Sequence, residues 1–442
     1  MTAQLSDIQA GSIDKFEITS NDSSRGSKDL SAGVSEFRYY ESILSNYITA
    51  TAVMAETGYE SDGDNTVSGE GTVDGLPIRG GERTDIIIRD DYNNILSFRN
   101  GLYVNRVRNS DPNTQKDVYF LDFSSRDSFL NEETRVTRRY DGKVSSHIEN
   151  ILTQVLQTNS LIDIDETAGK YNFIGNTRKP FTVCTWLASK AVPQVTPGGG
   201  TAGSGLGGAA GYFFYQTRNS FHFKSIDKLF QGDPKRKYIY NSGKEVEGYD
   251  ANIIKYTIDR DVDLKESLVL GTYNNTTLFF DSFSFNYVHR NYNIKDQKTK
   301  IDSAGRNFAP EGVADEFKAY PSRLMTSILD NGVLPEGTNS TAQLAKWKSE
   351  PQTPNYDAPN AMVQSVMRYN QLFTIQIQVI IPGDFTIKAG DLVECAFPKL
   401  EGSPTKEINR QSSGIYMVAH VCHRITSSDT LTSLSLIRDS YR

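Results

Sequence analysis

The sequence predicts a mainly β protein with an α+β middle, in which antiparallel modules at the two chain ends are joined by mixed α/β insert domains. Segments near both ends alternate polar and apolar residues, which is the period of a strand with one buried face. Helical patterns are concentrated between these segments. The 23 Tyr and 22 Phe among 442 residues are also typical of β structure.

The chain is too long for one core, because domains usually hold about 100–200 residues. Residues 1–125 and 361–442 are expected to form strand-rich modules, each a small barrel or sandwich. Residues 126–240 are predicted to form an α/β middle domain with a flexible Gly-rich loop at 197–211. Residues 241–360 form a second middle region, β-rich at first and then a polar connector. No sequence repeat is evident, although two β modules can still be related in shape.

The first module is predicted to contain five strands. The turn Leu-Pro-Ile-Arg-Gly-Gly-Glu at residues 76–82 precedes one of them, because Pro and Gly favour turn conformations. A polar loop is expected at 62–75, and a hairpin connection containing Asp-Pro-Asn at 109–116. The strands are predicted at residues 36–41, 48–53, 85–88, 102–104 and 118–123.

The middle domain is predicted to contain two helices and a hairpin. Apolar residues recur at three- and four-residue steps from Val144 to Leu156, which indicates an amphipathic helix. A second helix begins at Pro180, a residue tolerated in the first turn, and ends before Pro193. Aromatic segments after the Gly-rich loop are expected to pair as two strands. These elements are predicted at residues 143–156, 181–190, 211–216 and 220–224.

The remaining chain is predicted to be strand-like, then polar, then strand-rich again. A short helix is expected near 342–348, and a helix at 361–372 leads into the last module. Turns are expected at 382–384 and 388–391, where Pro and Gly occur. The strands are predicted at residues 252–258, 268–273, 278–289, 374–379, 392–397, 415–425 and 432–436.

Composition excludes several classes of protein. The net charge is −7 and no block of Lys or Arg stands out, so the electrostatic pattern of a duplex-binding protein is missing. The three cysteines, Cys184, Cys395 and Cys422, are an odd number and widely spread, which indicates a reducing compartment without a disulfide framework. No secretory signal and no apolar run of the ~20 residues that span a bilayer is visible. We therefore expect a soluble protein made in a cytoplasm.

Three apparent binding motifs are rejected on their context. The GxGxxG match in the Gly-rich loop lacks the preceding strand and following helix of a dinucleotide site. An acidic loop resembles a calcium loop but lacks its Gly and its flanking helices. Two histidines three positions apart on a strand point to opposite faces, so they do not readily share a metal. The residues are Gly203, Gly205 and Gly208, then Asp62, Asp64 and Glu70, and finally His420 and His423 on either side of Cys422.

One acidic cluster is a candidate for catalysis. Asp163, Asp165 and Glu166 follow the first predicted helix, and paired carboxylates perform glycoside hydrolysis. A charged turn is the simpler interpretation of the cluster. No serine nucleophile elbow and no P-loop is found. We therefore assign no catalytic, cofactor-binding or metal-binding residues, expect no cofactor, and predict that the protein is not an enzyme.

The ordered combination of several strand and turn segments resembles one known family. The chain is similar to the central baseplate hub proteins of contractile-tailed, T-even-type bacteriophages. Its N-terminal match includes the Leu-Pro-Ile-Arg-Gly-Gly-Glu turn, and its C-terminal match includes Ala-Gly-Asp-Leu-Val. The segments that carry the resemblance are residues 37–44, 76–82, 119–125, 389–398, 413–423 and 436–440.

The resemblance implies a homotrimer in which each chain contributes two tube-type antiparallel β-barrels to a pseudo-hexameric ring. Such a ring adapts the sixfold tail tube to the threefold spike and lines the DNA channel. The implied partners are further copies of the chain, a tail spike or tail lysozyme protein, a tail tube or tube-initiating protein, and baseplate wedge proteins. Neither membrane insertion nor sequence-specific nucleic-acid binding is implied. The implied location is the virion baseplate, assembled in the host bacterial cytoplasm.

Three alternatives stay open at this point. The first is a hub of another contractile injection system, such as a tailocin or a type VI secretion machine. The second is a wall-degrading tail enzyme that uses Asp163, Asp165 and Glu166. The third is a carbohydrate-binding module that uses exposed Tyr and Phe side chains. From the net charge we also expect an acidic bore in the hub, which would repel DNA phosphates.

Overall fold

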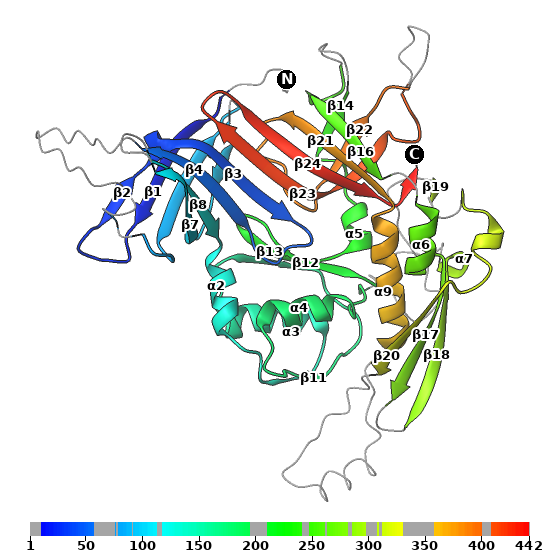
Figure 1. Ribbon diagram of the computed structural model, residues 1–442. Coiled ribbons are helices and arrows are strands. Elements are labelled where there is room, and N and C mark those ends of the chain that lie inside the picture. The colour runs from blue at the N-terminus through cyan, green and yellow to red at the C-terminus, as the bar shows by residue number, and fades with distance from the viewer. Residues whose placement is uncertain are drawn as a thin grey trace, which may run out of the picture.

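One large sheet runs through both ends of the chain, and the helices lie below and beside it (Figure 1). Hairpin strands from the two ends lie side by side in its middle (Figure 1). The computed structural model describes residues 10–56, 76, 78–90, 92–112, 117–194, 210–240, 247–260, 263–281, 285–297, 307–308, 312–329, 358–399 and 408–441.

The N-terminal module is a curved antiparallel sheet that wraps a single core. Its strands alternate, so that Phe16, Phe37, Leu121 and Phe123 all point to the buried side. All five predicted strands are confirmed, and the chain before them adds two more. The elements are β1 (Ser12–Thr19), β2 (Ser27–Asp29), η1 (Ser31–Gly33), β3 (Val34–Ser42), β4 (Thr49–Glu56), β5 (Arg83–Arg89), β6 (Ile95–Ser97), β7 (Leu102–Pro112) and β8 (Asp117–Ser124).

The C-terminal module confirms its four predicted strands and adds three from residues 236–260. Tyr238, Ala251 and Ile253 from that earlier segment lie in the same core as Ile377 and Leu434. The module therefore takes strands from the region that the sequence assigned to the middle. Its strands are β14 (Arg236–Ile239), β15 (Ala251–Asn252), β16 (Lys255–Arg260), β21 (Ile375–Pro382), β22 (Leu392–Ala396), β23 (Gly414–Thr426) and β24 (Thr430–Arg438).

The two modules join into one sheet, and neither closes into a barrel within the described residues. The reason is the length of β23. Its first part pairs with β22, and on the same edge its residues His420–Thr426 pair with β3 of the N-terminal module. The other edge of β23 pairs with β24. The mainly β class with its mixed middle is confirmed, whereas the two expected barrels are open sheets fused along a seam.

The two modules repeat the same strand order. The N-terminal sheet runs β3-β4-β8-β7-β5 and the C-terminal sheet runs β16-β21-β24-β23-β22, with every neighbouring pair antiparallel. A bulge follows Val104 in β7, and a bulge follows Val418 at the matching place in β23. Because order, direction and irregularity agree, the chain contains an internal structural repeat.

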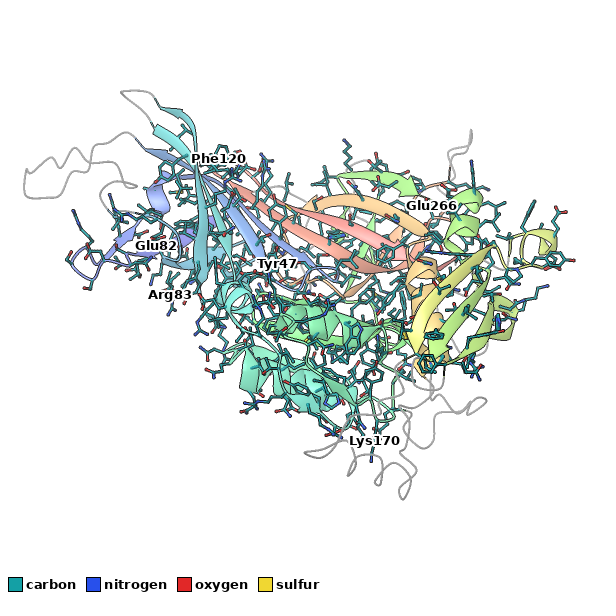
Figure 2. All side chains as sticks on the ribbon, turned by 60° about the horizontal axis from the view of Figure 1, so that its bottom comes forward. Tyr47, Glu82, Arg83, Phe120, Lys170 and Glu266 are labelled. Carbon is teal, nitrogen blue, oxygen red and sulfur yellow. The ribbon has the colours of Figure 1, made fainter. Side chains whose placement is uncertain are left out.

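A shared turn leads into β5 and β22, and it is visible in the sequence. Residues 78–82 read Ile-Arg-Gly-Gly-Glu, and residues 387–391 read Ile-Lys-Ala-Gly-Asp. Gly81 and Gly390 have φ angles of 85° and 88°. Glu82, labelled in Figure 2, and Asp391 each accept a bond of 2.9 Å from the backbone N–H three residues earlier. The expectation that the two β modules can be related in shape is therefore confirmed; within the motif only Ile and Gly are identical, so the sequence alone is not enough to show a repeat.

The middle domain lies below the sheet (Figure 1). Both helices and the hairpin that were predicted in it are confirmed. The first helix ends in a π-helical stretch, and Pro180 begins the second. The elements are α2 (Arg126–Glu133), β9 (Arg139–Tyr140), α3 (Val144–Asn150), η2 (Ile151–Val155), β10 (Leu161–Ile164), β11 (Phe173–Ile174), α4 (Pro180–Ala188), β12 (Tyr212–Gln216), β13 (Ser220–Ser225) and α5 (Ile226–Phe230).

A second insert packs a small sheet on the long helix α9. Its outer face exposes Phe280, Tyr287, Leu324 and Ile328, while its inner face meets α9. The predicted helix at 361–372 is confirmed as part of α9. The elements are α6 (Leu264–Leu270), β17 (Asn274–Asp281), β18 (Asn286–Asn293), α7 (Ile294–Gln297), β19 (Asn307–Phe308), η5 (Asp315–Phe317), β20 (Arg323–Leu329), α9 (Ala358–Leu372) and β25 (Ser440–Tyr441).

Two predictions in the second insert are wrong. The first half of the expected strand at 268–273 lies in α6 and the second half in the turn after it, because Asp263 caps that helix and Gly271, with φ of 68°, ends it. The expected single strand at 278–289 is the hairpin of β17 and β18. The acidic loop at 62–75, most of the Gly-rich loop and the helix near 342–348 lie outside the described residues.

Candidate assembly interface

A single buried carboxylate joins the N-terminal module, the middle domain and the C-terminal module. Glu41 in β3 is 3% exposed. It accepts hydrogen bonds from the Tyr39 hydroxyl at 2.7 Å, the Arg218 backbone N–H at 3.0 Å and the Ala389 backbone N–H at 3.0 Å. Arg218 lies in the β12–β13 turn, and Ala389 lies in the repeated turn before β22. Glu41 therefore holds three parts of the chain in one fixed arrangement.

A second polar contact fixes the middle domain on the N-terminal module. Gln216, at the end of β12, accepts bonds from the Ser125 hydroxyl at 2.8 Å and the Ile48 backbone N–H at 3.3 Å. Its amide nitrogen donates to Asp127 in α2 at 3.3 Å. Because Gln216 and Asp127 are both buried, these bonds position α2 and the hairpin against the base of the sheet.

A buried ion cluster ties the long helix to the C-terminal module. Arg368 in α9 is 1% exposed and pairs with Asp439, between β24 and β25, and with Asp227 in α5 at 3.3 Å. Apolar contacts from Leu372, Met417 and other buried side chains surround this junction. Both inserts are thus anchored to the sheet by buried charge, which suits a rigid assembly scaffold.

These three anchors were missed by the sequence analysis, although signals for two of them exist. Glu41 shares its strand face with Phe37 and Tyr39, so the alternation already places a charge on the buried side. Arg368 lies at helical spacing from Leu372 on the buried side of α9. A charge on an apolar face indicates a buried partner elsewhere in the chain.

The titration of Glu41 gives a testable pH dependence. Burial raises the pKa of Glu41 above its ordinary value of 4.5, despite the hydrogen bond from Tyr39. A raised folded pKa means that stability from Glu41 is complete below pH 4.5 and is lost as pH rises through the folded pKa. Wild type is expected to lose stability relative to Glu41→Gln as pH rises from 4 to 8, measured as the free energy of unfolding in urea.

Glu36, on the outer face of the same strand, supplies a control of opposite sign. Although partial burial opposes it, hydrogen bonds from Arg38 and Arg424 lower the pKa of Glu36. The stability that Glu36 contributes to the fold is present above pH 4.5 and is lost as pH falls through the lowered pKa. Glu36→Gln should therefore lose stability relative to wild type as pH rises. Parallel pH profiles for the two variants would contradict the burial argument.

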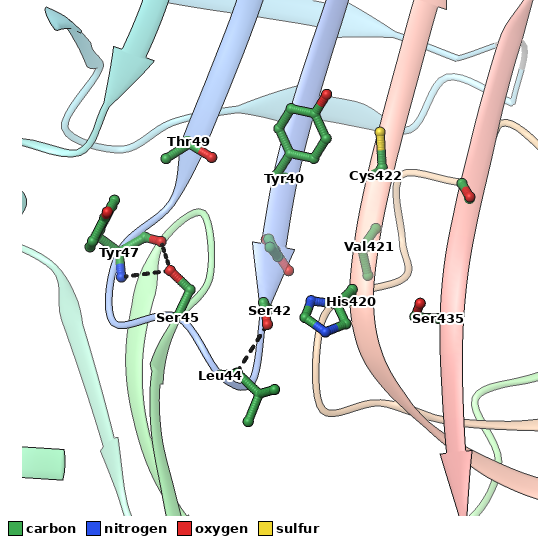
Figure 3. A pocket seen from close by; sticks show the side chains of 12 residues that line it. Tyr40, Ser42, Leu44, Ser45, Tyr47, Thr49, His420, Val421, Cys422 and Ser435 are labelled. Carbon is green, nitrogen blue, oxygen red and sulfur yellow. Dashed lines mark hydrogen bonds between the residues drawn. The ribbon is translucent and has the colours of Figure 1, made fainter. Parts of the chain in front are cut away.

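A hollow of about 620 Å³ lies over the seam between β3 and β23 (Figure 3). Tyr40 and Cys422 are direct partners across this seam. In the adjoining loop the Ser42 hydroxyl accepts a bond of 3.0 Å from the Leu44 backbone N–H. Most of the lining residues are uncharged, and Tyr47 from the β3–β4 connection lies at one side. Such a surface suits contact with a partner more than chemistry.

The histidines and the cysteine at the seam do not form a metal or nucleophile site. His420 is exposed on the outer face and His423 is buried on the inner face, which confirms that they point apart. Burial raises the pKa of the Cys422 thiol. A protonated thiol is a poor nucleophile. Among the described residues, no group of three His, Cys, Asp or Glu side chains is placed to hold a metal ion.

The acidic cluster of the middle domain is held by lysines. Asp163 pairs with Lys224, and Asp165 is buried and pairs with Lys224 and Lys228 at 3.2 and 2.7 Å. Burial of Asp163 is outweighed by its bond from Lys224, so its pKa is lowered. A glycosidase acid needs a raised pKa. The arrangement is therefore that of a structural ion network, with Glu166 exposed beside it.

An Asp–His–Thr chain, which the sequence analysis missed, also lies here. His222 contacts Asp163 at 3.3 Å and the Thr217 hydroxyl at 2.9 Å. The parallel pairing of β10 with β13 brings these distant residues together, and no local pattern predicts it. Thr217 is 1% exposed and His222 stacks on Tyr215, so a substrate has no access to the hydroxyl. These hydrogen bonds between Asp163, His222 and Thr217 orient the β12–β13 turn, whose backbone donates to Glu41.

No described helix is long and apolar enough to span a bilayer. Neither the models of known protein families nor the curated proteins give a match to the sequence. Solved structures do align with the chain. For a tail protein from Neisseria meningitidis MC58, the alignment covers 96% of each chain, with 10% identity and a TM-score of 0.52. For the 43 kDa tail protein of prophage MuSo2 from Shewanella oneidensis, it covers 96% of this chain and 98% of that one, with 9% identity and a TM-score of 0.50.

Both alignments run through the two modules and the inserts, because they include nearly all residues of each chain. Sequence identities this low show that the fold is shared and nothing more. They confirm the predicted resemblance at that level, since the neighbours are tail proteins: this chain has the fold of a phage-type tail protein.

Proposed function

We propose that the chain is the structural hub at the centre of a phage tail baseplate, where three copies form a ring of six modules. The observation that carries this proposal is the internal repeat, two sheets of the same strand order fused side by side. Three chains with two modules each present six similar surfaces while keeping threefold symmetry. The tail-protein fold supports the same assignment.

In this role the ring adapts a sixfold tail tube to a threefold spike and surrounds the path of the DNA. Its partners are the other two copies, the tail tube or tube-initiating protein, the spike or tail lysozyme protein and the wedge proteins. The buried anchors at Glu41 and Arg368 keep the modules and inserts rigid under load. The hub is assembled in the host cytoplasm and acts in the virion baseplate without catalysis. Its bore is acidic, as expected from the net charge of the chain.

The mass of the full chain in solution tests this proposal. Light scattering after size exclusion is expected to give the mass of three chains for the protein alone, and of three chains plus the spike when the spike partner is added, because each module needs a neighbour at its open edge. A chain that stays monomeric at every concentration, with and without the spike partner, would contradict the hub.

A further inference from the structure

Two long strand edges are left without a partner in the described part of the chain. β16 pairs with β21 on one side only. β7 pairs with β8 along its length, but its other edge pairs with β5 only at Leu102 and Tyr103. Ile258 in β16 is 45% exposed, and Ile254, just before the strand, is 41% exposed. Open, partly apolar edges are templates for pairing with another chain, and natural proteins usually block or cover them.

These two edges occupy equivalent places in the internal repeat. In the order shared by the modules, β16 corresponds to β3, and β7 corresponds to β23. The seam within the chain is formed by β3 pairing with the distal half of β23, residues His420–Thr426. Each chain therefore already contains one contact between an edge of the β3 type and an edge of the β23 type.

From this repeat we infer that β16 of one copy adds to the free edge of β7 in the next copy, antiparallel, as β3 adds to β23 within the chain. This inference rests on the proposed trimeric hub. The contact is head-to-tail, so each copy offers one edge of each kind and a ring forms when the rotation closes. Three copies then give six seams, alternating between and within chains.

The shared bulge fixes the register of the seam between copies. A second bulge, between Asn109 and Asp111, adds one residue to β7, so Asp111 holds the position of Arg424: Asp111 pairs with Val118 of β8, and Arg424 pairs with Leu431 of β24. By the same ladders, Thr257 in β16 holds the position of Arg38 in β3. Arg38 and Arg424 are direct partners. Thr257 of one copy is therefore opposite Asp111 of the next.

Burial at the existing seam explains the exposed apolar residue at the open edge. Tyr39 in β3 is fully buried and stacks on His423 of the other module, with ring centroids 6.2 Å apart. Ile258 holds the equivalent position in β16. Its exposed side chain becomes buried when the next copy docks, as Tyr39 is buried by β23.

Disulfide cross-linking tests this register. Directly opposed residues of antiparallel strands have Cα atoms about 4.5–5.5 Å apart, within reach of a disulfide. The pair Thr257→Cys with Asp111→Cys is made in a Cys422→Ser background, because Cys184 and Cys395 are buried. After mild oxidation, dimers and trimers that dissociate on reduction are expected on denaturing gels. The single variants are expected to stay monomeric on the same gels.

Two further pairs control for register and chemistry. Arg38→Cys with Arg424→Cys should close a disulfide within one chain, because these residues are partners in the existing seam. Thr257→Cys with Arg106→Cys lies several positions out of register and should not cross-link. If the protein is trimeric and the internal pair closes but Thr257–Asp111 does not, the inferred seam is wrong while the hub stands. If no trimer forms at all, both are overturned.

A charge at the seam gives an independent readout. Ile258→Glu is expected to convert the trimer to a monomer with unchanged circular dichroism, because its side chain is exposed in the single chain. Leu161→Glu is the matched control, since Leu161 is 51% exposed on β10 of the middle domain, which pairs with β13 and belongs to neither edge. A trimer that survives Ile258→Glu, or that is lost equally with Leu161→Glu, would overturn the seam.

Discussion

Replacing Arg368 with methionine is expected to lower the free energy of unfolding by about 3–5 kcal/mol, because it leaves two carboxylates buried without their cation. Asp439 is fully buried and Asp227 is 8% exposed at its side chain. Methionine keeps most of the volume and the helix propensity of α9. Urea unfolding followed by circular dichroism measures the loss.

The exposed pair of Arg108 and Asp122 is the control for this prediction. Its guanidinium donates two bonds of 2.8 Å to the carboxylate, yet Arg108 is 40% exposed. Arg108→Met should cost about 1 kcal/mol or less, as exposed pairs do. Equal losses for the two variants would show that burial of the Arg368 cluster has no energetic role. Replacing Asp227 and Asp439 by apolar residues as well should restore part of the lost stability.

Replacing Gly390 with alanine is expected to cost about 2–5 kcal/mol, the sum of a left-handed backbone and an overpacked core. The φ angle of Gly390 is +88°, and an added Cβ would overlap the Tyr215 hydroxyl and lie 3.0 Å from its Cζ. Tyr215 is 3% exposed in the junction core, so it has no room to move aside. The change should also loosen the bond from Ala389 to Glu41.

The internal repeat supplies a matched control for Gly390. Gly81 occupies the same place in the N-terminal turn with φ of +85°, and the nearest atom to an added Cβ is Asn21 Nδ2 at 3.8 Å. Gly81→Ala should therefore cost only the backbone contribution, about 1–2 kcal/mol. Thermal and urea unfolding of both variants measure the difference. A Gly390→Ala variant no less stable than Gly81→Ala would contradict the close packing of Tyr215 on the turn.

Local patterns in the sequence predicted most elements correctly, because their signals are local. The alternation in β21 and β24 reflects one buried face, and the apolar steps in α3 reflect one buried side. The error at α6 has a local cause as well. Leu268, Val269 and Leu270 form a short apolar run that fits a strand or a helix, and the cap at Asp263 decides for the helix.

The features that position the interface are non-local, and one sequence does not specify them. β14 and β16 pair with β22 and β21, which lie more than a hundred residues later in the chain. The split pairing of β23 depends on the position of β3 in space rather than on the residues of β23. The repeated turn was present in the sequence, but two identical residues in five are too few to identify a repeat without the matching ladders.

The central claim is that two modules of each chain continue into a closed ring of six. Electron microscopy of the purified full-length assembly tests it most directly, by the number and symmetry of modules in end-on views. The account predicts a ring of six similar densities with threefold symmetry, in which β16 of one copy lies beside β7 of the next. A twofold dimer, an open chain of subunits or a ring of another number of modules would contradict it.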